Sequence, residues 1–417
     1  MTLSPGLLRA ASAALDAILS FSGPADQALS RYFRSQRQLG QQERAFVAEA
    51  AFAVLRRKRS LEAMAGEASP AVLIAAALLR VLGYSGRSLQ GLADEALLAR
   101  LRAARAEALP AAVRADLPDW LWQRLVAHHG EDEAMRIAQG FLNAAPLDLR
   151  VNLARTNREQ VLERLAADGL PGSATPHSPA GIRLEGKPAI NRHPLFEEGL
   201  VEVQDEGSQL LAWLLAPRRG EMVADYCAGA GGKTLALAML MRGSGRLYAM
   251  DVSAKRLAAL SPRAVRAGVS SIHPLVLSGD NDARVKRLAG KLDRVLVDAP
   301  CSGFGTLRRN PDLKWRHGET AVRELAAKQA RILASAARLV KPGGRLVYAT
   351  CSVLPEENEA IADAFLETRP DFGLLPCKDL LAAQHVSIDS EHYFRLWPHR
   401  HGTDGFFAAA FQKKALP

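Results

Sequence analysis

The 417-residue sequence predicts an α/β fold, a doubly wound and mostly parallel sheet, in its second half and an all-helical domain before it. Three observations support this. From Glu221 onward, short apolar runs typical of buried strands alternate with longer runs typical of helices. Residues 223–233 read as a strand that stops at a glycine-rich turn and continues as a helix. Residues 1 to about 145, by contrast, have apolar side chains at helical spacing.

The chain divides into three expected domains. Residues 1–140 form the helical domain, in which residues 72–82 are a buried helix stopped by Gly83. Residues 141–203 mix short strands with proline-containing loops and connect it to the rest. Residues 204–417 form the sheet domain. Its expected strands are 222–227, 246–250, 272–278, 293–298 and 344–350, followed by an antiparallel pair at 394–397 and 406–411.

Several polar or reactive residues follow directly after these strands. In an open α/β sheet, ligands bind at the carboxyl ends of the strands, so these residues should share one rim. They are the 225–233 turn, Asp251, Asp280, Asp298 to Cys301, and Cys351.

The glycine-rich turn fits three kinds of site. A dinucleotide site would have a third glycine where this chain has Thr234, and a phosphate-binding P-loop would have a glycine where it has Cys227. An S-adenosylmethionine site needs only close backbone approach. Asp251, about twenty residues further on, is placed to hold the ribose hydroxyls of a nucleoside, which a P-loop does not require.

Two cysteines occupy similar positions on the expected rim. Cys301 lies in Asp-Ala-Pro-Cys-Ser-Gly after one strand, and Cys351 lies in Thr-Cys-Ser after another. A thiolate is a strong nucleophile, and methylation of pyrimidine carbon 5 requires a nucleophile to add first at carbon 6. The pair therefore favours covalent chemistry on a base over inert packing.

These segments resemble the Sun/RsmB family of RNA cytosine-5 methyltransferases. The resemblance covers about residues 196–411 and rests on EVQDEGSQL, DYCAGAGGKT, VLVDAPCSGFGTLRRNPDLKW, PGGRLVYATCSVLPEENE and HGTDGFFAAAF. It implies a Rossmann-like class I methyltransferase domain. It also implies that Cys351 attacks the base, that Cys301 helps to release the product, and that Asp298 and Lys233 lie at the catalytic centre.

The same resemblance implies the binding site for S-adenosyl-L-methionine. Its expected residues are Cys227, Ala228, Gly229, Ala230, Gly231, Gly232, Lys233, Asp251, Asp280 and Asp298. The family commonly has Ala-Pro where this chain has Gly229-Ala230, which should loosen the turn while keeping the backbone open to the cofactor. The helical region resembles a NusB-like RNA-binding domain, which indicates 16S ribosomal RNA rather than transfer RNA as the substrate.

Composition is consistent with an RNA partner. The net charge is +10 and the pI is near 9.6, which indicates an anionic ligand, although a general basic bias would give the same values. Arg308, Arg309, Lys314 and Arg316 surround Trp315 and are expected to contact phosphates.

The remaining features limit the alternatives. Four cysteines without C-x-x-C spacing argue against a zinc site and for a reducing cytoplasm, and His392, His399 and His401 lack a metal-ligand pattern. No apolar run reaches the ~20 residues of a membrane span, and nothing in the sequence specifies an oligomeric state. The alternative functions are a transfer-RNA cytosine-5 methyltransferase, a P-loop nucleotide hydrolase and a non-catalytic RNA-binding assembly factor.

Overall fold

The computed structural model describes residues 3–279, 282–390 and 392–415 and divides into two compact units. The helical unit comprises Met1–Ala144 with Thr306–Glu319, and the sheet unit comprises Ala145–Gly305 with Thr320–Pro417. The chain thus contributes a short segment to the helical unit after the first cysteine motif and then returns to the sheet unit.

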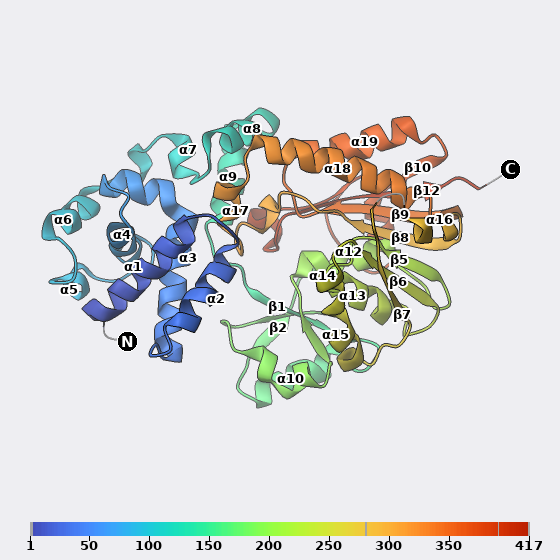
Figure 1. Cartoon of the computed structure of the whole chain (residues 1–417), viewed down its shortest axis with the longest axis horizontal. Helices are drawn as coiled ribbons and strands as arrows, with labels where there is room; N and C mark the ends of the chain where they lie inside the picture. Colours follow the sequence, from blue (N-terminus) through green and yellow to red (C-terminus); the bar gives the residue numbers. More distant parts are fainter. Residues whose placement is uncertain (1–2, 280–281, 391, 416–417) are drawn as a thin grey trace. The chain divides into compact units, whose positions relative to one another are not determined.

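The helical unit confirms the expectation of an all-helical region (Figure 1). Helices α1, α3 and α4 pack together around one apolar core. Ser4 caps α1 by accepting a hydrogen bond from the backbone N–H of Leu7 at 3.2 Å, and Pro5 occupies the first helical position. The helices are α1 (Pro5–Leu19), α2 (Ala25–Ser35), α3 (Gln41–Ala65), α4 (Pro70–Arg80), α5 (Gly86–Leu89), α6 (Glu95–Ala103), η1 (Ala106–Ala108), α7 (Ala111–Arg114), α8 (Asp119–His129), α9 (Glu131–Phe141) and α17 (Leu313–Arg316).

Helix α3 bends at Arg57, where φ is −121° and ψ is 28°. The backbone N–H of Ser60, whose regular helical acceptor would be the Arg56 carbonyl, donates to Asp116 Oδ1 at 2.9 Å. That carbonyl accepts a hydrogen bond from Lys314 Nζ at 2.8 Å, and the Leu55 carbonyl accepts one from Trp315 Nε1 at 3.1 Å. The segment 306–319 therefore satisfies the carbonyls that the bend releases.

This arrangement corrects one expectation. Lys314 and Arg308 are only 2% and 7% exposed, so they are packed within the helical unit and are not phosphate contacts. Burial lowers the pKa of Lys314 to about 7, with Asp116 acting against the shift.

The sheet unit begins with a small antiparallel sheet in the order β2-β3-β1-β4. Leu147 pairs with Leu184 and Val151 pairs with Val201, and α10 (Arg158–Ala167) covers the sheet through Val161. Its strands are β1 (Leu147–Val151), β2 (Gly172–Ala174), β3 (Gly181–Leu184) and β4 (Val201–Val203), followed by η2 (Ile190–Arg192) and α11 (Pro194–Glu197) in the connection between β3 and β4.

The large sheet has the order β10-β12-β9-β8-β5-β6-β7, with β11 paired to β12. The five strands β7, β6, β5, β8 and β9 are parallel, and β12 runs antiparallel to β9. This confirms the doubly wound, mostly parallel sheet. The strands are β5 (Met222–Asp225), β6 (Arg246–Asp251), β7 (Ile272–Val276), β8 (Leu292–Asp298), β9 (Val340–Thr350), β10 (Phe372–Leu375), β11 (Phe394–Leu396) and β12 (Phe406–Lys413).

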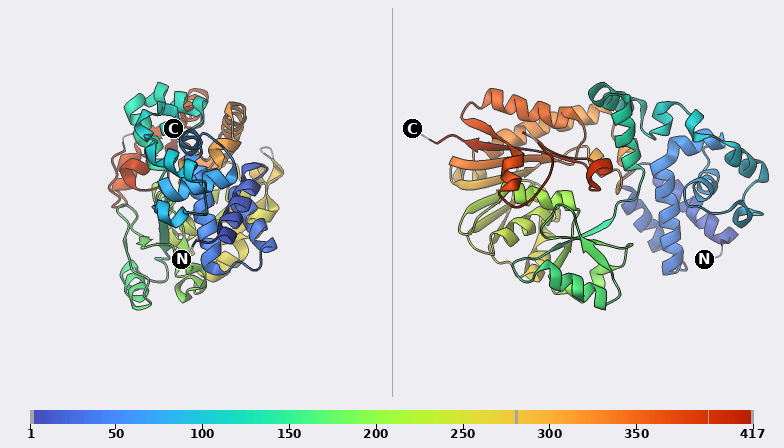
Figure 2. Two further views of the ribbon diagram at one scale, coloured as in Figure 1. Left: turned by 90° about the vertical axis from the view of Figure 1, so that its left-hand side faces the viewer. Right: turned by 180° about the vertical axis from the view of Figure 1, so that it is seen from behind.

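Helices cover both faces of this sheet (Figures 1 and 2). One face packs against α12, α13 and α20, and the other packs against α16, α18 and α19. The chain runs outward from β5 through β6 to β7 and then returns to β8 on the other side of β5, so the strand order reverses between β5 and β8. The helices are α12 (Glu206–Leu215), α13 (Gly232–Leu240), α14 (Ala254–Ala258), α15 (Leu260–Ala267), α16 (Ala283–Arg287), η3 (Phe304–Thr306), α18 (Glu319–Ala337), η4 (Pro355–Glu357), α19 (Glu359–Thr368), α20 (Cys377–Ala382) and α21 (Pro398–His401).

Within the described part of the chain, no individual helix has the length and apolar character to cross a membrane. Helices α3 and α4 reach that threshold only when taken together, and a bend of 98° separates them.

Candidate active site

The glycine-rich turn connects β5 to α13 at the point where the strand order reverses. Gly229 and Gly231 have φ values of +53° and +88°, which L side chains rarely adopt. A Cβ on Gly231 would lie 2.2 Å from Leu260 Cδ1, so no larger residue fits there. Glycine at position 231 therefore lets the turn pack directly against α15 at the start of α13.

Asp225, at the end of β5, is fully buried beneath this turn. Its Oδ2 accepts a hydrogen bond from the Thr234 hydroxyl at 2.7 Å. Burial raises the pKa of Asp225 to about 7, against the effect of that hydrogen bond. Thr234 stands where a dinucleotide turn would have its third glycine. Its hydroxyl instead binds Asp225 at the end of β5.

Asp251, the last residue of β6, lies beside the same turn and is 6% exposed. It accepts hydrogen bonds from the backbone N–H groups of Gly229 at 2.8 Å and Ser253 at 2.7 Å. The structure thus brings together the two segments that the sequence assigned to the cofactor. Asp280 lies outside the described residues.

Lys233 and Asp298 form an ion pair at the ends of α13 and β8. The distance from Lys233 Nζ to Asp298 Oδ2 is 2.7 Å, and Nζ lies 5.7 Å from the centre of the Phe406 ring. Burial by itself would lower the pKa of Lys233, but Asp298 more than offsets this and the net shift is upward. Lys233 therefore remains a cation held by a carboxylate, and this is not the arrangement of a lysine that cradles phosphates.

Cys301 and Cys351 come into direct contact. Their Sγ atoms lie 3.4 Å apart, although the residues are 50 positions apart in the chain. The contact with Cys351, together with burial, raises the pKa of the Cys301 thiol well above its ordinary value. Cys301 thus keeps its proton at neutral pH. Burial likewise raises the pKa of Cys227, so that residue is not suited to act as a nucleophile.

Backbone contacts fix the Cys351 loop. The N–H of Gly305 donates to the Cys351 carbonyl, and the N–H of Gly405 donates to the Gly305 carbonyl, both at 2.8 Å. A Cβ on Gly305 would lie 2.1 Å from the Gly405 carbonyl oxygen. The two backbone segments can approach this closely only because both residues are glycines. This explains why the HGTDGFF segment accompanies the two cysteine motifs.

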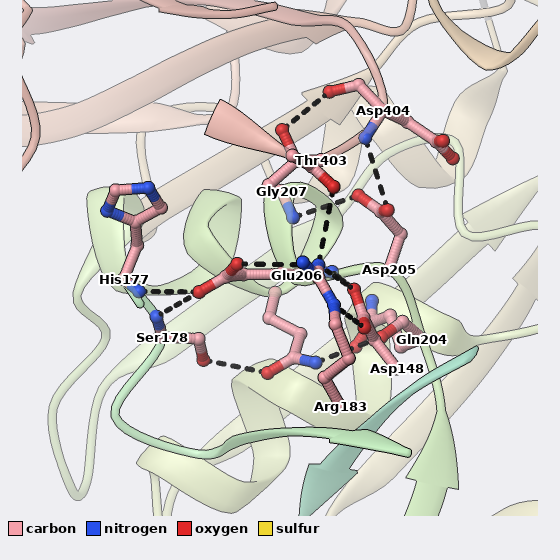
Figure 3. Close-up of polar contacts among 12 residues, drawn as sticks. Asp148, His177, Ser178, Arg183, Gln204, Asp205, Glu206, Gly207, Thr403 and Asp404 are labelled. Atoms are coloured by element: carbon pink, nitrogen blue, oxygen red, sulfur yellow. Dashed lines mark hydrogen bonds and ion pairs between the residues drawn. The ribbon is translucent and has the colours of Figure 1, made fainter. Parts of the chain in front are cut away.

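A polar network surrounds the start of α12 (Figure 3). Asp205 accepts hydrogen bonds from the N–H groups of Gly207 at 2.9 Å and Asp404 at 3.2 Å. Glu206 accepts from the N–H groups of His177 at 2.6 Å and Ser178 at 2.8 Å. The lead-in EVQDEGSQL is thus the segment that ties the small sheet to the β11–β12 connection.

The sequence analysis missed Arg150, on β1. Its guanidinium group is buried, donates to the Gly232 carbonyl at 2.8 Å, and also bonds the side chain of Gln204. Burial lowers the pKa of Arg150 to about 10. In the sequence, Arg150 is simply a charged residue that alternates with apolar ones in a predicted strand. That pattern cannot predict its contact with Gly232, which lies 82 positions away.

The histidines near the carboxyl terminus do not form a metal site. Across the residues that the structure describes, no group of three or more His, Cys, Asp or Glu side chains is placed to hold a metal ion.

The strand order and the position of the glycine turn together define a Rossmann-like class I methyltransferase fold. Comparison with known proteins agrees. Residues 212–412 match the family described as 16S rRNA methyltransferase RsmB/F, and residues 117–191 match the ferredoxin-like domain of RsmF/B-like methyltransferases. The chain therefore belongs to the RsmB/F methyltransferase family.

Individual relatives support the assignment. The chain is 38% identical to the probable ribosomal RNA small subunit methyltransferase B of Synechocystis sp., over 71% of this chain and 66% of that protein. A methyltransferase homolog protein from Pyrococcus horikoshii is 32% identical, with a TM-score of 0.63, over 73% of this chain and 97% of the other. The protein PH0851, known from a crystal structure, is 28% identical in sequence and has a TM-score of 0.81. The match covers 99% of this chain and 100% of the PH0851 chain.

Proposed function

We propose that this protein is an S-adenosylmethionine-dependent RNA methyltransferase that forms 5-methylcytosine through a covalent bond between Cys351 and the base. The observation that carries the proposal is the 3.4 Å contact between the two thiols at the carboxyl ends of β8 and β9. An amine or hydroxyl could be methylated without a protein nucleophile, whereas carbon 5 of cytosine requires one.

The residues around the glycine turn fit S-adenosylmethionine. Gly229 and Gly231 adopt the positive φ values that this turn requires, and Asp251 places a carboxylate at the end of the neighbouring strand. The expected contacts are Cys227, Ala228, Gly229, Ala230, Gly231, Gly232, Lys233, Asp251, Asp280 and Asp298. When bound, the cofactor supplies an electrophilic methyl group on a sulfonium centre.

The proposed reaction begins once the target cytosine has been turned out of its stack. The Cys351 thiolate adds to carbon 6 while Asp298, in its protonated form, donates a hydrogen bond to ring nitrogen 3, and the electron pair displaced from the carbon 5–carbon 6 double bond makes carbon 5 nucleophilic. After carbon 5 is methylated, a base removes its proton. The electrons of that C–H bond restore the double bond, and the carbon–sulfur bond breaks to return the thiolate of Cys351.

Cys301 is proposed to assist this last step. Because its pKa is raised, it remains a thiol and can donate a hydrogen bond to the departing sulfur. Lys233, paired with Asp298, holds that carboxylate in place.

We further propose that the substrate is 16S ribosomal RNA and that the reaction takes place in the cytoplasm, where all four cysteines are free thiols. The name of the Synechocystis relative, probable ribosomal RNA small subunit methyltransferase B, supports a ribosomal substrate. The net charge of +10 favours binding to a phosphate backbone, and the proposed role of the helical unit, which resembles a NusB-like domain in sequence pattern, is to anchor the RNA.

The two cysteines can be separated experimentally, because they act at different moments. The Cys351→Ala variant should have no activity and form no covalent complex. The Cys301→Ala variant should add to the base and methylate it but fail to release it, so a protein–RNA adduct should accumulate. Denaturing gel electrophoresis with labelled RNA measures both outcomes.

Cys377→Ala provides the control, because Cys377 is a buried thiol in α20, outside the proposed site. It should behave as wild type in the adduct assay. An adduct from Cys351→Ala and none from Cys301→Ala would reverse the two roles, and no adduct from any variant would argue against the covalent mechanism. Bisulfite sequencing of total RNA from cells with and without the protein would then identify the nucleotide.

A further inference from the structure

Glu357, the last residue of η4, is a completely buried carboxylate that the mechanism does not use. It contacts both segments that carry the thiols. Its Oε1 accepts a hydrogen bond from the backbone N–H of Ser302 at 2.8 Å, and its Oε2 accepts from the Ser302 hydroxyl at 2.5 Å. The Ser352 hydroxyl donates to the same Oε2 at 2.5 Å.

The two serines follow directly after the two cysteines, Ser302 after Cys301 and Ser352 after Cys351. Both are almost completely buried, at 1% and 2% exposure, and their hydroxyl oxygens lie 3.2 Å apart. The two serines thus face each other in the same way as the two cysteines that precede them in the chain. A single carboxylate joins the two motifs at this point.

A second layer holds the carboxylate itself. Gln329 Nε2 donates to Glu357 Oε1 at 2.9 Å and to the Pro300 carbonyl at 3.0 Å. The Tyr348 hydroxyl contacts the Gln329 side-chain oxygen at 3.2 Å and donates to the Glu357 carbonyl at 2.5 Å. The residue before Cys301 is therefore held by the same cluster.

A carboxylate is an unusual group to bury for packing alone. Burying a charge is costly unless hydrogen bonds satisfy it, and here four donors do so. An ionised carboxylate is an acceptor only, so it can draw both serine hydroxyls and a backbone N–H to one point. Its charge also contributes to the raised pKa of Cys301, after the effects of Cys351 and burial.

We propose that Glu357 is a positioning residue that holds Cys301 and Cys351 in contact, so that the Cys301 thiol can reach the sulfur that leaves carbon 6. The proposal rests on the covalent mechanism above, although the positioning itself can be measured without RNA. Loss of the carboxylate should let the two loops separate. Addition of Cys351 to the base would remain, while release would slow.

The proximity of the thiols gives a direct readout. An added oxidant, diamide, takes two electrons and two protons from the thiol pair and leaves a disulfide. We expect this to form rapidly between Cys301 and Cys351 in the wild type, and about tenfold more slowly in Glu357→Ala, a difference equivalent to about 1.4 kcal/mol. Glu357→Gln, which keeps the shape and one acceptor oxygen, should give an intermediate rate. Mass spectrometry of digested protein quantifies the bond.

Two further variants make the test specific. Glu367→Gln changes an exposed glutamate on α19 and should leave the disulfide rate unchanged. Ser352→Ala removes one hydroxyl donor and should slow the reaction even if Glu357→Ala does not fold. An unchanged rate in folded Glu357→Ala, or in Ser352→Ala if Glu357→Ala does not fold, would overturn the positioning role.

The RNA assay separates this inference from the proposed function. With RNA and S-adenosylmethionine, Glu357→Gln should accumulate more adduct than wild type, as Cys301→Ala does. If the disulfide rate falls but no variant, including Cys301→Ala, forms an adduct, the positioning role stands and the covalent mechanism fails. If Cys301→Ala forms an adduct and Glu357→Gln releases its product at the wild-type rate, the role of Glu357 in release is wrong.

Discussion

Asp225 shows how a single buried acid can link the glycine turn to pH. It is fully buried, and only its Oδ2 has a hydrogen-bond partner among the described residues, the Thr234 hydroxyl. The pKa of about 7 means that the folded protein binds a proton which the unfolded chain, with an ordinary value of 3.8, has already lost. Its ionisation is therefore a cost of folding at neutral pH.

The sign of the effect follows from linkage. The stabilisation due to protonated Asp225 is fully present below about pH 4 and is lost as the pH rises through about 7, with a slope of up to about −1.4 kcal/mol per pH unit. Asp225→Asn cannot ionise, so its free energy of unfolding should fall less over this range. Urea unfolding at a series of pH values measures the difference, and parallel curves for the two proteins would show that Asp225 ionises normally.

At this scale, the sequence predicted residues that lie at strand ends and missed those held by distant partners. Cys301, Cys351 and Lys233 could be found because parallel strands end at one edge of a sheet. Glu357 could not be found in this way, because its burial depends on Ser302, which lies 55 positions away. A glutamate in a charged run such as PEENE ordinarily indicates exposure.

Among the elements, the bend in α3 is the feature that sequence patterns could least predict. The bend lies at Arg57, and the N–H of nearby Ser60 donates to Asp116, which is 56 positions away in the chain. Positive charge beside a catalytic motif predicts phosphate contacts for the basic residues around Trp315. In the structure, Lys314 and Trp315 instead donate to carbonyls at the bend.

The contribution of Trp315 to the bend can be tested by substitution. Trp315→Phe keeps an aromatic six-membered ring but removes the indole N–H and its five-membered ring, so the Leu55 carbonyl loses this donor and the helical unit should be destabilised by at least about 1 kcal/mol. Amide hydrogen exchange across α3 should become faster. Trp213→Phe, in the sheet unit, is the matched control and should leave exchange in α3 unchanged. Equal exchange in both variants would mean that the bend does not depend on this contact.

The alternation of strands and helices after residue 221 predicted the five parallel strands of the large sheet correctly, because each is a local apolar pattern bounded by turns, but it missed the short edge strand β10. The antiparallel pair at the carboxyl terminus was also correct, with Phe394 opposite Ala408. Local patterns cannot predict that residues 306–319 belong to the helical unit while the residues on either side of them belong to the sheet unit.

This division of the chain affects how the whole molecule tolerates truncation. A protein that begins at Ala145 contains all the expected cofactor residues, so S-adenosylmethionine binding should persist while RNA affinity falls. It also retains Thr306–Glu319, whose buried Leu307, Arg308 and Lys314 belong to the deleted helical unit. That segment should therefore become exposed.

Limited trypsin digestion tests this, because the segment contains four basic residues, Arg308, Arg309, Lys314 and Arg316. We expect rapid cleavage there in the truncated protein and protection in the full-length chain. A second truncation, with 306–319 replaced by a glycine–serine linker, should bind the cofactor equally well. It should aggregate less, because it no longer exposes the side chains of this segment that are buried in the full-length chain. Continued protection of the segment in the first truncation would show that its folding does not require residues 1–144, and loss of cofactor binding in both would show that the helical unit supports the methyltransferase fold itself.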